Sequence, residues 1–351
     1  MTGALVELRG RLGSAARQNE PLARYTSSRV GGTADLFYVA RTRSDLTQAV
    51  DIATGLGVPW RLIGGASNLL VSDAGVGGLV VKVNTSGTRL VEAGSDRSVL
   101  VEAEAGCMLA AVARQVSHAG LSGLEWASNV PGTVGASVVN NSGAFGSSTA
   151  EHLVQAVVHT PGIGAGAVQA AELGLAYRTS RLKRGEIAGV VLQATYRVTR
   201  GDPAASRRRL HEVQEQRRRT QPSGYSLGSM FTNPPGDSAG RLIEVAGLKG
   251  RRVGGAEVSH LHANFILNRT SASTESPPDD GCDGQDSGPR PVHGRSSMTP
   301  ARARDILDLI KIIQETVWAD AHVWLIPEVQ FVGRWKPSEL RTLYESPAER
   351  P

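Results

Sequence analysis

The sequence is poor in cysteine and in aromatic residues. Phe, Trp and Tyr make up 5% of its 351 residues, and its two cysteines are Cys107 and Cys282. Two cysteines are too few for a disulfide framework or a cysteine-based zinc site. We therefore expect neither a disulfide scaffold nor a bound metal ion.

Long apolar runs are missing as well. No stretch approaches the ~20 apolar residues that a membrane helix needs, and the opening residues MTGALVELRG lack the features of a signal peptide. We expect a cytoplasmic protein that does not insert into membranes, and a monomer is our working expectation.

Glycine and positive charge are what the chain has in excess. It contains 41 glycines and carries a formal net charge of +5. The glycine content is typical of a loop-rich cofactor protein rather than a helical bundle. The charge suits either nucleic acid or ligands with several phosphates. Because no nucleic-acid-binding motif accompanies it, we expect small-molecule ligands and no nucleic acid.

The first part of the chain alternates between helix and strand patterns. Leucines at helical spacing predict a helix within residues 1–20, and a polar turn leads into a strand at 36–39. Ser44 is the expected N-cap of a helix over 45–54, and a second strand follows at 60–63. This predicts a small βαβ unit, although the glycine signature of standard dinucleotide-binding folds is missing.

A glycine-rich break follows that second strand. The sequence GGASN, residues 64–68, separates it from another apolar run at 69–71. Glycine permits positive φ and close approach of the backbone to a ligand, and successive N–H groups can form a concave anion site. A simple glycine hairpin is the alternative. The polar side chains of Ser67 and Asn68 favour a cradle for the pyrophosphate of a cofactor.

A second glycine-rich stretch spans residues 123–146, after a helix expected over Leu109–His118. Short strands are expected around these segments at 79–83, 98–104, 153–158 and 189–198. Because so many small residues pack poorly as a core, two such loops predict an extended ligand bound between two subdomains.

The C-terminal part opens with a basic segment at 199–222 around an expected helix. A solvated basic face is one interpretation, and contact of Arg218 or Arg219 with the diphosphate of a nucleotide sugar is another. Residues 270–300 are rich in Ser, Pro, Gly and Asp without apolar periodicity, so their composition predicts a disordered insertion. Thr299 and Pro300 then predict the start of a helix with one apolar face.

Several motifs together resemble the shorter subclass of the UDP-N-acetylenolpyruvoylglucosamine reductase family. In chain order they are Tyr25–Asp35, IGGASNLLVSDAG (63–75), VPGTVGASVVNNSGAFG (130–146), YRTSR (177–181), GSMFTNP (228–234), AGRLIEVAGLKG (239–250), HANFILN (262–268) and PEVQFVG (327–333). The resemblance covers roughly residues 20 to 335, apart from the insertion.

The resemblance implies an α+β fold, with a two-subdomain FAD-binding region of the p-cresol methylhydroxylase (PCMH) or vanillyl-alcohol-oxidase type and a C-terminal α/β substrate-binding domain. The implied divisions are an N-terminal helix at 1–19, the FAD-binding region at 20–202 with subdomains of about 20–83 and 84–202, the substrate-binding domain at 203–340 with the insertion 270–300, and a tail at 341–351.

The resemblance also implies FAD and NADPH as cofactors and a set of site residues. Those implied for FAD binding are Arg29, Gly64, Gly65, Ala66, Ser67, Asn68, Pro131, Gly132, Thr133, Gly135, Asn140 and Gly143. Those implied for the substrate are Tyr177, Arg218, Arg219 and Asn233, and those implied for catalysis are Arg178, Ser229 and Glu328.

Some positions depart from the family pattern. Ala66 and Ala136 stand where glycine is common, and Thr232 stands where lysine or a similar polar residue is common. A methyl group at the first two positions is tolerable if the local φ is negative. Thr232 puts a charged contact to substrate or cofactor in doubt.

The implied reaction is reduction of the enolpyruvyl double bond of UDP-N-acetylglucosamine enolpyruvate to give UDP-N-acetylmuramate. Hydride from NADPH would pass by way of FAD to C3. Arg178 and Glu328 would stabilise the charge that develops at C2 and on the carboxylate, and Ser229 would protonate C2. From the residues alone, Ser229 could equally be a turn serine, Arg178 a surface arginine and Glu328 an exposed strand-edge carboxylate.

Two other classes of function stay open from the sequence. A flavin oxidase on the same kind of scaffold would consume oxygen without NADPH. A non-catalytic protein that carries flavin or binds a nucleotide sugar would bind its ligand without turnover.

Overall fold

The computed structural model describes residues 3–92, 97–269 and 299–349. The expected insertion lies outside these residues apart from Thr299 and Pro300. The chain divides into two compact units. Unit 1 consists of Met1–Thr26, Gly32–Ser67 and Ala74–Arg219, and unit 2 of Ser27–Gly31, Asn68–Asp73 and Thr220–Pro351. The domain boundaries expected from the sequence stay a prediction.

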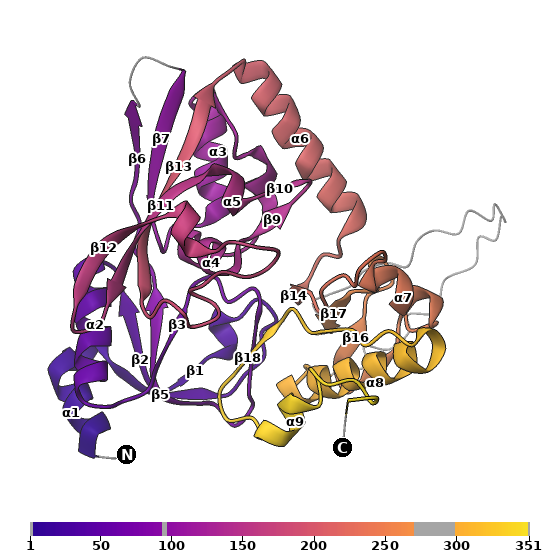
Figure 1. Ribbon diagram of the computed structural model, residues 1–351. Coiled ribbons are helices and arrows are strands. Elements are labelled where there is room, and N and C mark those ends of the chain that lie inside the picture. The colour runs from indigo at the N-terminus through magenta and orange to yellow at the C-terminus, as the bar shows by residue number, and fades with distance from the viewer. Residues whose placement is uncertain (1–2, 93–96, 270–298, 350–351) are drawn as a thin grey trace, which may run out of the picture. The chain divides into compact units, whose positions relative to one another are not determined.

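The described part of unit 1 contains a four-stranded sheet, a six-stranded sheet, the short strand pair β9–β10 and several helices (Figure 1). Its helices are α1 (Gly3–Leu12), η1 (Gly13–Ala15), η2 (Ala23–Tyr25), α2 (Arg43–Gly55), α3 (Leu109–His118), η3 (Glu125–Asn129), α4 (Val134–Asn140), α5 (Thr149–His152), η4 (Ala170–Leu173) and α6 (Pro203–Thr220). Its strands are β1 (Arg17–Pro21), β2 (Thr33–Ala40), β3 (Trp60–Ile63), β5 (Val76–Val83), β6 (Thr88–Glu92), β7 (Ser98–Glu104), β8 (Leu121–Ser122), β9 (Gly143–Ala144), β10 (Ser147–Ser148), β11 (Leu153–Thr160), β12 (Gly164–Gln169) and β13 (Val190–Arg200).

The first sheet has the strand order β1-β2-β5-β3, in which β2, β5 and β3 run parallel. The expected βαβ unit is present as β2, α2 and β3, but β5 lies between its two strands. Helix α2 buries the apolar stripe that its spacing predicts, namely Leu46, Ala49, Val50 and Ala53. This stripe packs α2 onto the sheet.

The N-cap of α2 is Thr42, so the prediction of Ser44 was wrong. The Thr42 hydroxyl accepts from the Asp45 N–H at 3.0 Å, and the Asp45 carboxylate accepts from the Thr42 N–H at 2.9 Å. This reciprocal capping box needs an acidic or amide side chain three positions after the cap. Thr42 has such a residue in Asp45, whereas Ser44 has none.

The second sheet of unit 1 is antiparallel, with the order β12-β11-β13-β7-β6 and with β8 joined to β13. Tyr196 on β13 is fully buried, and its hydroxyl lies 3.0 Å from the Ser137 hydroxyl of α4. Burial raises the pKa of Tyr196 to about 12. This contact ties α4 to the centre of the sheet.

The described part of unit 2 contains a small antiparallel sheet, a parallel pair of strands and three helices. Its elements are β4 (Leu69–Val71), β14 (Tyr225–Ser229), α7 (Ala239–Val245), β15 (Arg252–Val253), β16 (Ala256–Val258), β17 (Phe265–Asn268), α8 (Ala303–Ala321), β18 (Gln330–Val332) and α9 (Pro337–Arg341). The sheet order is β14-β17-β16-β15, and α8 packs against β15, β16 and α7 (Figure 1).

Helix α8 begins later than Thr299 and Pro300 suggest. Its first residue is Ala303, and the carboxylate of Asp73 accepts from the N–H groups of Ala303 and Arg304 at 2.9 Å each. Asp73 therefore acts as a cap from a distant part of the chain, and negative charge is favourable at a helix N-terminus. The apolar face of α8 is buried as predicted, with Ile306, Leu309, Ile310, Ile313 and Val317.

The two strands on either side of the GGASN break belong to different units. β3 pairs with β5 in unit 1, whereas β4 pairs in parallel with β18 in unit 2. The hairpin alternative is therefore wrong, because β3 and β4 do not pair with each other. Within the described residues, no helix is long and apolar enough to span a bilayer.

Candidate active site

The two glycine-rich loops of unit 1 lie in direct contact. A Cβ on Gly65 would approach the Cα of Gly132 to 2.8 Å, and a Cβ on Gly64 would overlap the Thr133 hydroxyl. Both glycines are therefore required for the first loop to lie against the second. The sequence attributed them to approach of a ligand, and the structure adds this approach of one loop to the other.

Several backbone donors at this contact are unsatisfied. Within the described residues, the N–H groups of Ala66, Ser67, Gly132 and Thr133 have no hydrogen-bond acceptor. Ala66, Gly132 and Thr133 are buried. Buried N–H groups in native proteins are almost always paired, and adjacent donors of this kind form anion sites. The two loops therefore fit the diphosphate of a dinucleotide cofactor.

Ala66 adopts a conformation that the sequence did not predict. Its φ is 46°, in the left-handed region, and its side chain is buried. The condition for tolerating a methyl group, a negative φ, is therefore not met at this position, and the loop accepts a local cost of about 1–2 kcal/mol. At Ala136 the condition is met, because the residue lies inside α4.

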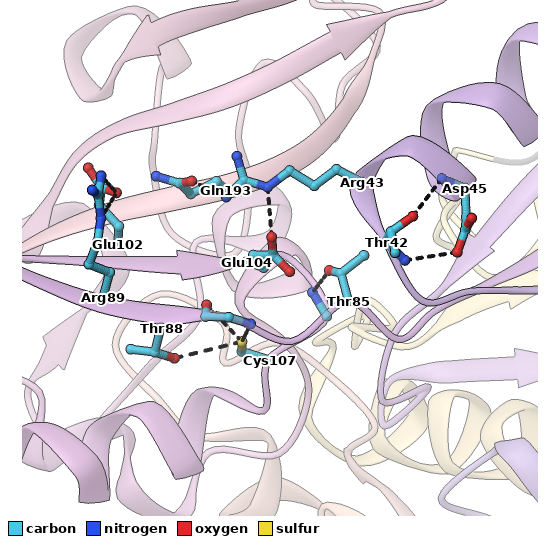
Figure 2. Close-up of polar contacts among 12 residues, drawn as sticks. Thr42, Arg43, Asp45, Thr85, Thr88, Arg89, Glu102, Glu104, Cys107 and Gln193 are labelled. Atoms are coloured by element: carbon cyan, nitrogen blue, oxygen red, sulfur yellow. Dashed lines mark hydrogen bonds and ion pairs between the residues drawn. The ribbon is translucent and has the colours of Figure 1, made fainter.

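The second loop is supported by the segment that follows β7. Gly132 accepts from the Leu109 N–H at 3.1 Å, and the Val134 N–H donates to the Cys107 carbonyl at 2.9 Å. Figure 2 shows polar contacts beside this segment: Arg43 binds Glu104 at the end of β7 and Gln193 of β13, and the Cys107 thiol lies near Thr88. The Arg43 to Glu104 contact, 2.9 Å long, thus joins α2 to the end of β7.

The other residues expected to bind FAD have structural contacts of their own. A Cβ on Gly135 would lie 2.9 Å from the Cβ of Ala105, and one on Gly143 would lie 2.8 Å from the Ser147 carbonyl oxygen. The Asn140 amide donates to the Ala136 carbonyl at 3.0 Å. Pro131 is exposed at the tip of the second loop. Their role in cofactor binding stays a prediction.

The sequence analysis did not single out two buried polar groups near the second loop. Among the described residues, neither the Trp126 indole N–H nor the Ser128 hydroxyl has a hydrogen-bond partner, although both side chains are buried. Both belong to η3, which leads directly into the loop. Their position inside the glycine-rich stretch was the signal that could have identified them.

Arg178 lies in a tight turn in unit 1. Ala176 and Thr179 exchange two backbone hydrogen bonds of 3.1 Å, and Arg178 between them has a φ of 56°. Such a backbone costs about 1–2 kcal/mol in a non-glycine residue and persists where surrounding contacts hold it. Here the Asn141 amide donates to the Ala176 carbonyl at 2.9 Å, and the Lys183 ammonium donates to the Arg178 carbonyl at 2.8 Å.

Tyr177, expected to bind substrate, precedes Arg178 in this turn and is 64% exposed. The Arg178 guanidinium carbon lies 5.4 Å from the centre of its ring. The exposed ring is therefore available for contact with a ligand, and the roles of Tyr177 and Arg178 stay predictions.

Ser229 ends strand β14 of unit 2 at an irregularity in the sheet. The register against β17 shifts between Ser226 and Ser229, and Gly228 there has a φ of 76° that favours glycine. Bulges of this kind redirect side chains and are frequent beside active sites. The Ser229 side chain is half-buried, and within the described residues its hydroxyl has no hydrogen-bond partner.

Glu328 lies on the backbone segment beside Ser229. Its N–H donates to the Met230 carbonyl at 2.8 Å, and Phe231 forms an antiparallel bridge with Pro327. The structure thus brings together two of the three predicted catalytic residues in unit 2. The third, Arg178, belongs to unit 1.

Asn264, which the sequence did not single out, holds the segment after Ser229. Its side chain accepts from the Phe231 N–H and donates to the Phe231 carbonyl, both at 2.9 Å, and its own carbonyl accepts from the Met230 N–H at 2.9 Å. It is buried. A buried amide with both ends used fixes the backbone that carries Ser229.

Two residues expected to bind FAD lie in unit 2. The Asn68 amide donates to the Glu328 carbonyl at 3.1 Å, and its carbonyl accepts from the Gln330 N–H at 3.0 Å, so it also positions Glu328. Arg29 is exposed, has a φ of 57°, and its guanidinium carbon lies 5.4 Å from the centre of the Tyr225 ring.

The remaining predicted substrate residues make local contacts. Arg218 and Arg219, at the end of α6, are largely exposed and both pair with Glu215. The Asn233 side-chain oxygen accepts from the Ala239 N–H at 3.1 Å. These contacts fit the interpretation of a solvated basic face, and the substrate assignments stay predictions. Within the described residues, no group of three or more His, Cys, Asp or Glu side chains is arranged to hold a metal ion.

Comparison with known proteins identifies two domain families in the chain. The family described as "FAD binding domain" matches residues 34–164, and the one described as "UDP-N-acetylenolpyruvoylglucosamine reductase, C-terminal domain" matches residues 220–276. The fold and the donor-lined glycine loops thus define an FAD-dependent oxidoreductase.

Individual relatives identify the family. UDP-N-acetylenolpyruvoylglucosamine reductase of Chloroflexus aggregans is 39% identical over 90% of this chain and 97% of its own, and that of Rubrobacter xylanophilus is 38% identical over 92% and 97%. The crystal structure of the Thermus caldophilus reductase matches with a TM-score of 0.70 and 30% identity, over 90% of this chain and 98% of its own. The chain belongs to the UDP-N-acetylenolpyruvoylglucosamine reductase family.

Proposed function

We propose that the enzyme reduces UDP-N-acetylglucosamine enolpyruvate to UDP-N-acetylmuramate with NADPH as the source of hydride, and that it works in the cytoplasm as a monomer. Family membership supports the reaction. The unsatisfied N–H groups of Ala66, Ser67, Gly132 and Thr133 support the binding of FAD. When bound, FAD supplies hydride transfer between NADPH and C3 of the substrate.

In this proposal Ser229 holds the proton that C2 receives. The observation that carries the assignment is the placement of its hydroxyl at the β14 bulge, without a partner among the described residues and beside the backbone of Glu328. An alkyl hydroxyl is a weak acid, so it donates only to a strong base. The carbanion-like C2 that follows hydride addition at C3 is such a base.

Arg178 and Glu328 complete the catalytic set. A guanidinium forms paired hydrogen bonds with a carboxylate, so Arg178 would bind the enolpyruvyl carboxylate, where negative charge grows. Glu328 would share a hydrogen bond with the same group and support that charge. The backbone strain at Arg178 is consistent with a functional position, because strained residues cluster at active sites.

The test separates the two half-reactions in Ser229→Ala. Anaerobic stopped-flow absorbance should show flavin reduction by NADPH at close to the native rate, because that step needs no acid at C2. Reoxidation by the substrate should slow by ~10²–10⁴-fold, the usual cost of losing a general acid. Ser229→Cys should recover part of the rate, since a thiol can also donate.

Ser226→Ala, on the same strand before the bulge, is the matched control and should leave both steps unchanged. Loss of the NADPH step in Ser229→Ala, with the substrate step intact, would instead make Ser229 a cofactor contact. Sedimentation of the purified enzyme tests the monomeric state.

A further inference from the structure

Two cations in unit 1 each bind the backbone at the start of a glycine loop. The Lys82 ammonium donates to the Gly64 carbonyl, and the Arg217 guanidinium donates to the Asn129 carbonyl. Both side chains are half-buried. The Lys82 contact lies at the beginning of the GGASN segment, and the Arg217 contact lies directly before the loop that contains Gly132.

Lys82 reaches Gly64 because of the sheet register. In the parallel pair β3–β5, Ile63 is the partner of Lys82, so the next residue along the chain is within reach of the ammonium. No described peptide bond is cis, and in a trans peptide the C=O and N–H point in opposite directions. By holding the Gly64 carbonyl, Lys82 therefore sets the direction of the Gly65 N–H.

Arg217 differs from the two arginines that follow it. Arg218 and Arg219 are largely exposed and both pair with Glu215. Arg217 is half-buried and turns to Asn129 instead. The three arginines look alike in the sequence, and the structure singles out one of them at the glycine loop.

Neither cation has a counter-charge among the described residues. In the part of the chain that the structure describes, no carboxylate pairs with Lys82 or Arg217, and each side chain donates to one backbone carbonyl. Removal from water lowers the pKa of both groups. A half-buried cation normally has an acidic partner, so both positions are explained if the partner is an anion bound from solution.

We propose that Lys82 and Arg217 are positioning residues for the cofactor's diphosphate: each orients one glycine loop through its first carbonyl, and their two charges offset the negative charge that the loop N–H groups bind. The proposal rests on FAD binding to these loops and not on the catalytic roles of Ser229, Arg178 and Glu328. A neutral donor could hold each carbonyl equally well, so the charge is the feature to test.

The test measures FAD affinity of the full-length enzyme, from the flavin fluorescence that appears on dilution. Lys82→Met and Arg217→Met should each weaken FAD binding by about 10–100-fold, the scale of one charge-assisted hydrogen bond. Lys82→Arg and Arg217→Lys keep the charge and should recover most of the affinity. Native affinity should fall as salt is raised, and the methionine variants should show a flatter dependence.

Arg209→Met and Arg89→Met are the controls, because both arginines are exposed and paired with glutamates. Both should bind FAD as the native enzyme does. Native affinity in both methionine variants would overturn the proposal. So would weaker binding that the charge-conserving variants fail to restore, or that keeps the native salt dependence, because the role would then be structural.

The methionine variants are replaced if they do not fold, as judged by far-ultraviolet circular dichroism. In that case the salt dependence of FAD affinity, measured for the native enzyme and the charge-conserving variants, tests the proposal. FAD affinity that does not change with salt would overturn the proposal. An enzyme purified without any flavin would contradict FAD binding itself, which is a separate failure from loss of the substrate step in Ser229→Ala.

Discussion

The glycine loops of unit 1 and the Ser229 segment of unit 2 position their functional groups by opposite means. In unit 1 the decisive groups are backbone N–H donors, and Gly65 brings the loops together because it has no side chain. In unit 2 the decisive groups are side chains, and buried amides such as Asn264 hold the backbone that carries them. Adding a side chain should therefore damage the glycine loops, and removing a side chain should damage the Ser229 segment.

This difference follows from the ligand that each region serves. A diphosphate accepts many hydrogen bonds from a bare backbone, whereas delivery of one proton needs a single side chain in a defined place. Four changes, taken from the largest expected effect to the smallest, test this comparison.

Gly65→Val should abolish flavin binding. The added Cβ would lie 2.8 Å from the Gly132 Cα, and backbone on both sides cannot move aside cheaply. The purified variant should be folded and colourless, as measured by absorbance of flavin per protein. Gly166→Val, at a position with open space around it, is the control and should remain yellow. Stoichiometric flavin in Gly65→Val would mean that these loops do not hold the cofactor.

Asn264→Ala should damage unit 2 and spare the cofactor. It leaves the N–H and the carbonyl of Phe231 without partners in a buried place, which costs roughly 1–3 kcal/mol for each group. Urea denaturation should show the lower stability, and turnover should fall while the flavin content of the folded protein stays native. Ser223→Ala, which is exposed, serves as the control. Equal loss of flavin and turnover would contradict the separation of the two regions.

Acid should destabilise unit 2 through Glu257. Desolvation raises the pKa of this fully buried carboxyl, but hydrogen bonds and charge from Arg269 and Arg252 outweigh it and hold the pKa below its usual value. Stability from this group is therefore complete above the unfolded pKa of about 4.3 and is lost as the pH falls through the lower folded value.

In Glu257→Gln the free energy of unfolding should depend less on pH in this acid range. The variant should also be less stable at neutral pH, because Arg269, 2.8 Å from Glu257, loses the negative charge of that carboxylate. Urea denaturation across a pH series measures both effects. An acid dependence unchanged from the native protein would show that other carboxylates are responsible.

Asp73→Ala should have the smallest effect, a loss of about 0.5–2 kcal/mol typical of a helix cap. The carboxylate binds the first two N–H groups of α8, and asparagine at this position should retain part of the stability because one acceptor remains. Asp308→Asn removes only a surface pair with Arg304 on the same helix and should change stability by less. Thermal unfolding of the three variants gives the comparison.

The sequence was sufficient wherever the signal is local. The apolar spacing within 109–118 and within 45–54 predicted α3 and α2, and the short β-type run at 98–104 predicted β7. The glycine-rich stretches and the motifs around Ser229 and Glu328 indicated the cofactor loops and the candidate catalytic residues. Periodicity and short motifs suffice in these cases because the residues that interact are close in sequence.

The tertiary structure alone decided which distant groups meet. In the sequence, Lys82 is an ordinary strand lysine, Arg217 is one of three adjacent arginines, and Asp73 is a loop residue. In the structure, Lys82 binds Gly64, Arg217 binds Asn129, and Asp73 caps α8. The split of the GGASN segment between two units was likewise visible only in the folded structure. A hydrogen bond between residues far apart in the chain leaves no periodic trace in the sequence, so only the folded backbone could identify these partners.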